Sequence, residues 1–283
     1  MVLSTAPLVA SADETPDVRI SEVLVSASSE DYDGVDWNGD GIAESTQEAS
    51  YDDDGNVNGI TVYEMGLCTS DPLAGINTTT GNTSNNSIDE SSCTKTFQSA
   101  NGSLVDLSGS TAQTLTGTNF RPPSGTYPHA YIKIKNTFGL KGSYTINSQT
   151  YYSKNNGTPG AIGTYSEFDE NLLDFNGGPT CSSSPELGAY ETFTTGATGT
   201  MKASLAQVSG GNLGTYTADS SCGSSTHLFG AFSPTSPVVI TDNTQGLEVS
   251  FTITDSGMTV IPNGSGGIQT FAGGPFRPSF TVF

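Results

Sequence analysis

Carboxylate side chains that can bind a cation are concentrated near the start of the chain. Ten acidic residues fall between positions 30 and 54, and no Lys or Arg occurs between Arg19 and Lys95. So many negative charges repel one another unless a cation binds them or solvent screens them. The acidic residues are Glu30, Asp31, Asp33, Asp36, Asp40, Glu44, Glu48, Asp52, Asp53 and Asp54. This segment is therefore the first candidate for a binding site.

Within the cluster, residues 36–44 have the spacing of a calcium-binding loop. Oxygen-bearing side chains occur at alternate positions, so they converge on one ion, and the glycine at the sixth position permits the sharp turn. The predicted ligands are Asp36, Asn38, Asp40, the carbonyl of Ile42, and Glu44, with Asp31 and Asp33 as candidates to complete the shell.

This nine-residue segment resembles the first part of an EF-hand loop and the calcium loops of dockerins. It departs from that pattern at the twelfth position, where Gln47 replaces the bidentate glutamate. The resemblance implies calcium as a cofactor, bound with a Kd of about 10⁻⁴ to 10⁻³ M, as in extracellular modules. The alternative is an Asp-, Asn- and Gly-rich hairpin that binds no particular ion.

The four cysteines indicate disulfides rather than a metal site. They lack the C-x-x-C and Cys/His spacings of zinc, haem and thioredoxin-like sites, and their flanking residues are typical of loops. Three pairings are possible, and the simplest closes two local loops, each adding about 3 kcal/mol of stability. It joins Cys68 to Cys93 and Cys181 to Cys222. Disulfides would place the protein outside the cytoplasm. The alternative to disulfides is four buried free thiols.

The sequence offers little support for an enzyme. The only histidines, His129 and His227, lie in no metalloprotease motif, and no G-x-S-x-G or phosphate-binding glycine loop occurs. Glycosidases need only two suitably spaced carboxylates, which 29 acidic residues such as Glu167, Asp169 and Glu170 easily provide. We predict a protein that is not an enzyme, and a secreted glycoside-acting enzyme is the least favoured alternative.

Charge and hydropathy exclude two kinds of partner. The chain has 283 residues with 9 basic and 29 acidic side chains, so its formal charge is −20. Phosphate contacts require a basic surface, so this balance argues against nucleic acid and against anionic membranes. No stretch approaches the roughly 18 to 20 apolar residues of a spanning helix, so we predict no membrane span.

Alternating hydrophobicity predicts an all-β fold. Leu247, Val249, Phe251 and Ile253 share one face of a strand, as do Ala130, Ile132 and Ile134. The pattern predicts an antiparallel β-sandwich, jelly-roll or Ig-like, with long Gly-, Ser- and Asn-rich loops. Residues 255–257 predict a hairpin turn, 166–174 a short helical turn and 73–92 a long surface loop. Strands are expected over 18–25, 60–65, 130–135, 144–151, 198–208, 237–241, 247–254, 257–262 and 276–283.

Residues 1–17 are predicted to form an apolar arm or the remnant of a signal peptide. Ala10-Ser11-Ala12 has the small-x-small form of a cleavage site, but no Lys or Arg precedes the apolar run. The apolar residues of this arm are Val2, Leu3, Leu8 and Val9. Residues 18–283 form the β-sandwich region, either as one large sandwich or as two stapled halves that divide near 176–180.

The composition resembles that of prokaryotic surface-fibre subunits and secreted adhesins. That resemblance implies an extracellular structural protein at the cell surface. The N-terminal arm can add as a strand to the sheet of a neighbouring copy, and repeated head-to-tail addition gives a filament. Phe280, Val282 and Phe283 form an apolar C-terminal end that either joins such an interface or completes the core. The alternative is a monomeric adhesin or carbohydrate-binding module for surface glycans.

Overall fold

The computed structural model shows a protein built from β-strands. No described residue is in a helix. The described part of the chain therefore contains no helix that could cross a membrane. The structure describes residues 17–23, 46–50, 59–74, 88–105, 113–146, 149–154, 158–160, 168–172, 186–192, 199–209, 212–215, 225–252, 258–262, 267–273 and 277–283.

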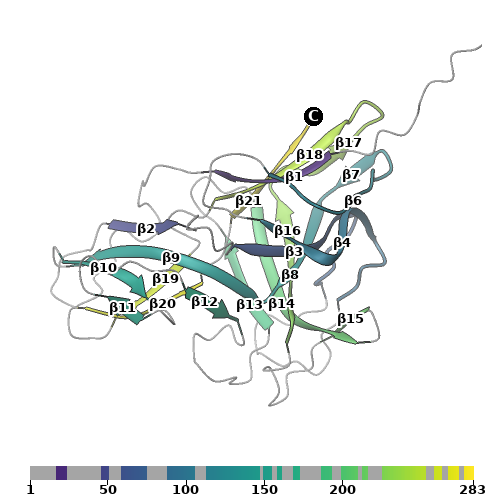
Figure 1. The fold of residues 1–283 in the computed structure, drawn as a ribbon. Coiled ribbons are helices and arrows are strands. Elements are labelled where there is room, and N and C mark those ends of the chain that lie inside the picture. The colour runs from purple at the N-terminus through teal and green to yellow at the C-terminus, as the bar shows by residue number, and fades with distance from the viewer. Residues whose placement is uncertain are drawn as a thin grey trace, which may run out of the picture.

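The largest sheet has eight strands, and all of its pairs are antiparallel (Figure 1). It brings together segments far apart in the sequence, since β16 pairs with β8 and β8 pairs with β3. Its order is β13 (Glu186–Thr192), β14 (Gly199–Ser209), β16 (His227–Pro234), β8 (His129–Lys135), β3 (Ile60–Cys68), β4 (Cys93–Val105) and β6 (Thr118–Asn119), with β15 (Asn212–Thr215) paired to β14.

A four-stranded sheet joins the two ends of the described chain. Its order is β21 (Arg277–Val282), β18 (Gly246–Thr252), β1 (Asp17–Val23) and β5 (Gln113–Thr114). β1 runs parallel to β18 over seven residue pairs, and this is the one parallel pair among the described strands. Figure 1 shows β1 beside β18, close to the C-terminus.

The remaining strands form one five-stranded and two two-stranded sheets. β19 and β20 contact strands of the five-stranded sheet, and Figure 1 shows these strands gathered on one side of the molecule. The five-stranded sheet contains β11 (Thr158–Gly160), β10 (Gln149–Lys154), β9 (Thr137–Ile146), β12 (Phe168–Asn171) and β2 (Thr46–Ser50). The pairs are β17 (Val238–Ile240) with β7 (Gly125–Tyr127), and β19 (Met258–Pro262) with β20 (Ile268–Gly273).

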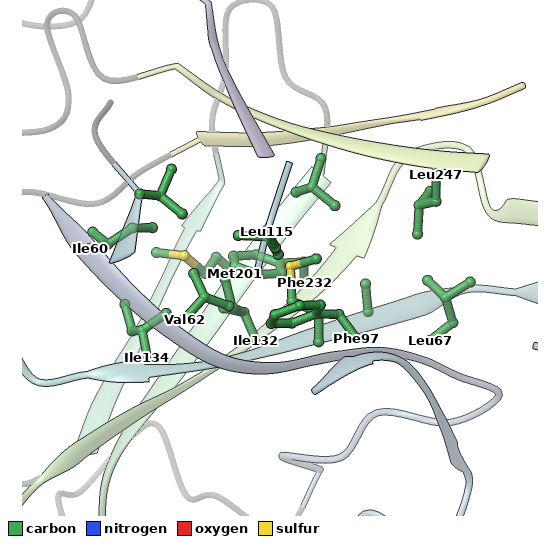
Figure 2. Packing of buried hydrophobic residues seen from close by; sticks show 14 of the residues in the cluster. Ile60, Val62, Leu67, Phe97, Leu115, Ile132, Ile134, Met201, Phe232 and Leu247 are labelled. Carbon is green, nitrogen blue, oxygen red and sulfur yellow. The ribbon is translucent and has the colours of Figure 1, made fainter. Parts of the chain in front are cut away.

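The main core lies where the eight-stranded and four-stranded sheets face each other. Alternate residues of each strand point inward, because successive side chains of a strand lie on opposite sides of its sheet. Ile132 and Phe232 from the large sheet pack in one cluster with Leu247 and Val249 of β18, as Figure 2 shows for several members. The cluster also contains Ile60, Val62, Met65, Leu67, Phe97, Ile134, Met201, Leu140, Phe168 and Phe271.

The all-β, antiparallel fold class predicted from the sequence is confirmed. The expected inward faces are present, with Ala130, Ile132, Ile134, Leu247 and Val249 all buried. The choice between jelly-roll and Ig-like strand order stays a prediction, as does the division near 176–180, which lies outside the described residues.

Three local predictions are wrong. β18 pairs with β1 and β21, and β19 pairs with β20, so 255–257 does not connect two hairpin partners. Phe168–Asn171 is a strand rather than a helical turn, because buried Phe168 pairs with Leu140 of β9. The strand expected over 144–151 is two paired strands, β9 and β10, separated by the turn-forming types Asn147 and Ser148.

The Cys68–Cys93 disulfide is confirmed, whereas the predicted character of its surroundings needs correction. Cys68 ends β3 and Cys93 begins β4, so both lie opposite each other in register rather than in loops. The segment predicted as a long surface loop over 73–92 begins with Leu73, which is fully buried. Leu73 and Ile88, near the two ends of this segment, pack against the outer face of the sheet, whereas Ala74, Asp89 and Ser91 are exposed.

Candidate functional site

Polar and charged side chains gather on the outer face of the eight-stranded sheet, which we define as the side opposite the main core. Directly opposed residues of an antiparallel pair have side chains on the same face. Glu64 opposes Lys133, and Cys68 opposes His129, across β3 and β8. On the other side of β8, Tyr131 opposes Ala231 of β16, which in turn opposes Lys202 of β14. Four strands thus carry the groups of this face.

A buried carboxylate, Glu64, lies at the centre of one group of these side chains. Its side chain is 7% exposed and accepts hydrogen bonds from four groups on β4 and β8. The Glu64 oxygens lie 2.7 Å from Lys133 Nζ, 2.8 Å from Tyr131 Oη, 2.8 Å from Lys95 Nζ and 3.2 Å from Gln98 Nε2. We call these five residues the Glu64 cluster.

The surroundings keep the Glu64 carboxyl ionised. Burial by itself raises its pKa, but hydrogen bonds and charge from Lys133 and Lys95, with a smaller contribution from Tyr131, hold the pKa below its usual value. The Tyr131 hydroxyl shows the opposite effect. Burial and the nearby negative charge of Glu64 raise the pKa of Tyr131 far above its usual value, so the hydroxyl remains a hydrogen-bond donor.

Lys133 links the Glu64 cluster to the last residues of the loop that the Cys68–Cys93 disulfide closes. Its ammonium group also lies 2.8 Å from Glu90 Oε2 and 5.4 Å from the centre of the Tyr131 ring. Tyr131 is stacked on Phe229, with ring centres 5.4 Å apart and planes 5° from parallel. The ammonium group of Lys133 is therefore held by two carboxylates and by cation–π contact with these rings. The cluster therefore pins the segment containing Glu90 to the sheet.

A loss of stability in acid follows from the lowered pKa of Glu64. A carboxylate whose pKa is depressed in the folded state stabilises that state fully above its unfolded-state pKa of about 4.3. This contribution disappears as the pH falls through the lower folded-state pKa. We expect the urea midpoint to drop between about pH 5 and about pH 3. Urea unfolding followed by circular dichroism at constant ionic strength should show a smaller drop of the midpoint with pH for Glu64→Gln than for the wild type. The same pH dependence in both proteins would contradict the role of Glu64 in this loss of stability.

A second polar group lies at the opposite end of β8 from Lys133. Lys202 Nζ donates hydrogen bonds to Asp71 Oδ2 and to the Leu73 carbonyl, the latter at 3.3 Å. The Leu73 amide donates to Asp71 Oδ1 at 2.8 Å, which orients the carboxylate. His129 Nδ1 lies 2.8 Å from Ser233 Oγ. These contacts tie the chain after β3 to β14 and join β8 to β16.

Both histidines are neutral near pH 7. Burial lowers the pKa of His129; Asp71 raises this pKa and Lys202 lowers it. Burial and the charge of Lys133 lower the pKa of His227, whose ring packs against Tyr63. Each ring has a hydroxyl partner, Ser233 for His129 and Thr226 for His227. Their strands, β8 and β16, are central in the sheet.

The sequence-predicted sites lie outside the described residues. This applies to the calcium ligands Asp36, Asn38, Asp40, Ile42 and Glu44, to Asp31 and Asp33, and to Cys181, Cys222 and the arm residues Val2, Leu3, Leu8 and Val9. Within the described ranges, no group of three or more His, Cys, Asp or Glu side chains is placed to hold a metal ion.

Sequence reasoning missed the Glu64 cluster and the Lys202–Asp71 pair. A weak signal was present for Lys133, which interrupts an apolar strand at a position that alternation assigns to solvent. Glu64 gave no such signal, because it is in phase with the inward residues Ile60 and Val62 and reaches the outer face through the register shift between Val62 and Glu64. Both side chains are nevertheless buried, and the described residues Leu73, Ile88 and Glu90 cover parts of this face. That cover depends on contacts between distant parts of the chain.

Comparisons with known proteins identify no relative. No protein-family model, no curated protein and no solved structure matches this chain.

Proposed function

We propose that this chain is a structural subunit of an extracellular, calcium-stabilised filament that assembles head to tail through a terminal strand. The observation that carries the proposal is the position of β21. This C-terminal strand forms one end of the four-stranded sheet and pairs with β18 on one side. Among the described strands none pairs with its other edge. Backbone groups along such an edge can accept a strand from another copy.

Apolar side chains near this edge support strand addition. Phe280 and Val282 pack partly against the main core, while the terminal Phe283 is 47% exposed. The apolar side chains Val2, Leu3, Leu8 and Val9 are available in the N-terminal arm to cover such a surface. A head-to-tail contact of this kind does not close on itself, so it extends into a filament.

The Cys68–Cys93 disulfide supports an extracellular location. It closes a separation of 25 residues at the ends of two paired strands. Disulfides persist in oxidising compartments and are rare in the cytoplasm. Closing a loop of this length adds about 3 kcal/mol of stability by the chain-entropy relation. Such a staple suits a subunit that must remain folded outside the cell.

Calcium is the proposed cofactor because of the acidic segment 30–54. Bound calcium would offset part of the repulsion in a chain with a formal charge of −20. A ligand present at about 100 times its Kd stabilises the folded state by about 2.7 kcal/mol. A site with a Kd of about 10⁻⁴ M reaches this ratio at about 10 mM calcium, so it matters in a calcium-rich medium.

Negative-stain microscopy of the full chain in calcium and then in chelator tests this proposal. We expect filaments in calcium and dispersed particles in chelator. Asp40→Ala should assemble poorly in both conditions and lose the calcium-dependent rise in melting temperature. Asp169→Ala is the matched control, because it removes one negative charge from an exposed position on β12 outside the acidic segment.

Deleting residues 1–12 tests the arm separately. The truncated chain should fold, with an unchanged far-ultraviolet circular dichroism spectrum, but should no longer assemble. Normal assembly after the deletion would overturn the role of the arm. Dispersed particles of the full chain in both calcium and chelator would overturn the filament, and retention on polysaccharide would then favour a monomeric glycan-binding module.

A further inference from the structure

The buried lysine Lys202 and the carboxylate of Asp71 are held together on the outer face. They are 131 residues apart in the sequence, and their side chains are 9% and 19% exposed. The Leu73 amide fixes one oxygen of Asp71, and the Leu73 carbonyl accepts a second hydrogen bond from Lys202 Nζ. The amine nitrogen and the carboxyl carbon are therefore kept in a fixed relation.

Apolar residues border this pair. Ala231 lies directly opposite Lys202 in the sheet, and Leu73 follows Asp71 by two residues. Both are buried members of an apolar cluster with Cys68, Tyr131 and Phe229. A low-dielectric environment penalises separated charges, so it favours the neutral amine and the neutral carboxylic acid relative to the ion pair.

The Glu64–Lys133 pair provides a useful contrast on the same face. Glu64 accepts from two lysines and a tyrosine, which hold its carboxyl in the ionised form. An ionised carboxylate is a poor electrophile, because attack would add to a group that already carries negative charge. Of the ion pairs between described residues, Asp71 makes one, with Lys202. Among the described contacts, the carboxyl of Asp71 thus has one lysine partner, whereas that of Glu64 has two.

We propose that Lys202 and Asp71 become joined by an intramolecular isopeptide bond after folding. The proton first passes from Lys202 Nζ to Asp71 Oδ2, which leaves a neutral amine beside a neutral acid. Nζ then attacks Cγ of Asp71, a nitrogen–carbon bond forms, and a carbon–oxygen bond breaks. The departing hydroxyl takes a proton from the nitrogen and leaves as one water molecule. No oxidant or reductant is needed.

This bond would complete the attachment of the outer-face cover. The disulfide at Cys68 already fixes the start of the segment that leads to Asp71. An amide to Lys202 would join the same segment to β14, two strands beyond β8 in the sheet. The covalent tie is independent of whether the protein forms filaments, so the two proposals can fail separately.

Intact-mass spectrometry of the purified full chain, denatured and fully reduced, tests the proposal. We expect the wild-type mass to be lower than the mass of its own sequence by one water molecule. Tryptic digestion should leave the bond after Lys202 uncut and yield one branched peptide containing both Lys202 and Asp71. A wild-type chain with no loss of water and with normal cleavage after Lys202 would overturn the proposal.

Two lysine variants make the measurement independent of processing at the ends of the chain. Lys202→Arg keeps the positive charge and the ion pair, but a guanidinium remains protonated and does not act as a nucleophile. It should show no loss of water relative to its sequence. Lys133→Arg is the matched control and should retain the loss. If the measured masses of the wild type and of Lys202→Arg differ only by the mass of the substitution, the proposed bond is also overturned.

Discussion

Replacing Glu64 by alanine is expected to lower the free energy of unfolding by about 3–5 kcal/mol. The substitution leaves Lys133 buried with one carboxylate partner instead of two, and it removes the acceptor of the Tyr131 hydroxyl. A buried charge that loses its partner retains its full desolvation cost. Urea unfolding followed by circular dichroism, under conditions that keep the Cys68–Cys93 disulfide intact, measures the change as a lower midpoint at constant slope.

Glu90→Ala provides the control for this effect. Glu90 contacts the same ammonium group at nearly the same distance, 2.8 Å against 2.7 Å, but its side chain is 33% exposed. Solvent screens such a pair, so we expect a loss of about 1 kcal/mol or less. Equal losses for Glu64→Ala and Glu90→Ala would contradict the view that burial, rather than ion pairing as such, makes Glu64 important.

Removing both charges should be less harmful than removing one. Glu64→Leu combined with Lys133→Met replaces the central ion pair by apolar side chains and leaves no buried ammonium without its carboxylate. Buried ion pairs replaced in this way often leave stability unchanged or raise it. We expect the double variant to be more stable than Glu64→Ala alone. A double variant less stable than Glu64→Ala would show that Lys133 contributes through its contacts with Tyr131 and Phe229.

Much of the strand content could be predicted because alternation is a local property. Residues 130–135 are read correctly as a strand with Ala130, Ile132 and Ile134 inward. Whether the other side of that strand is buried depends on contacts with distant parts of the chain. Tyr131 and Lys133 occupy positions typical of a solvent-facing side, yet they are buried, with Leu73 and Ile88 in the cluster around Tyr131 and Glu90 against Lys133.

Strand partners were harder to predict than strands. Residues 247–252 were recognised, but their neighbours are β1, more than 200 positions earlier, and the C-terminal strand β21. A turn signal at 255–257 favours a local hairpin, yet the inward residues Leu247 and Val249 are buried against the large sheet. Packing of this apolar side, rather than the turn, determines which strands lie beside β18.

The Cys68–Cys93 part of the cysteine prediction is confirmed, because a local closure requires no knowledge of the overall topology. Sequence left three pairings open, and the local one predicts the observed partner of Cys68. The Glu64 cluster had no comparable signature. Glu64, Lys95 and Lys133 belong to three different strands, so their contacts arise only once β3, β4 and β8 pair in register. A site of this kind follows from the topology and cannot be read from spacing along the chain.

Gly66→Ala should destabilise the protein by about 3 kcal/mol, because Gly66 makes room for Tyr131. A Cβ at this position would lie 2.3 Å from Tyr131 Cε1 and 2.6 Å from the main-chain oxygen of Thr94. The first contact can be relieved only by moving a ring that is stacked on Phe229 and bonded to Glu64. The second is with backbone of the neighbouring strand β4, which cannot move without disturbing the pairing.

Gly125→Ala is the matched control for this substitution. A Cβ at Gly125 in β7 would lie no closer than 3.6 Å to the ring of Tyr127, an ordinary van der Waals distance. We expect its stability to stay within about 0.5 kcal/mol of the wild type. Near-ultraviolet circular dichroism should change for Gly66→Ala alone, since Tyr131 must leave its stack on Phe229. If the two variants unfold at the same urea concentration, the close approach at Gly66 does not hold Tyr131 against Glu64.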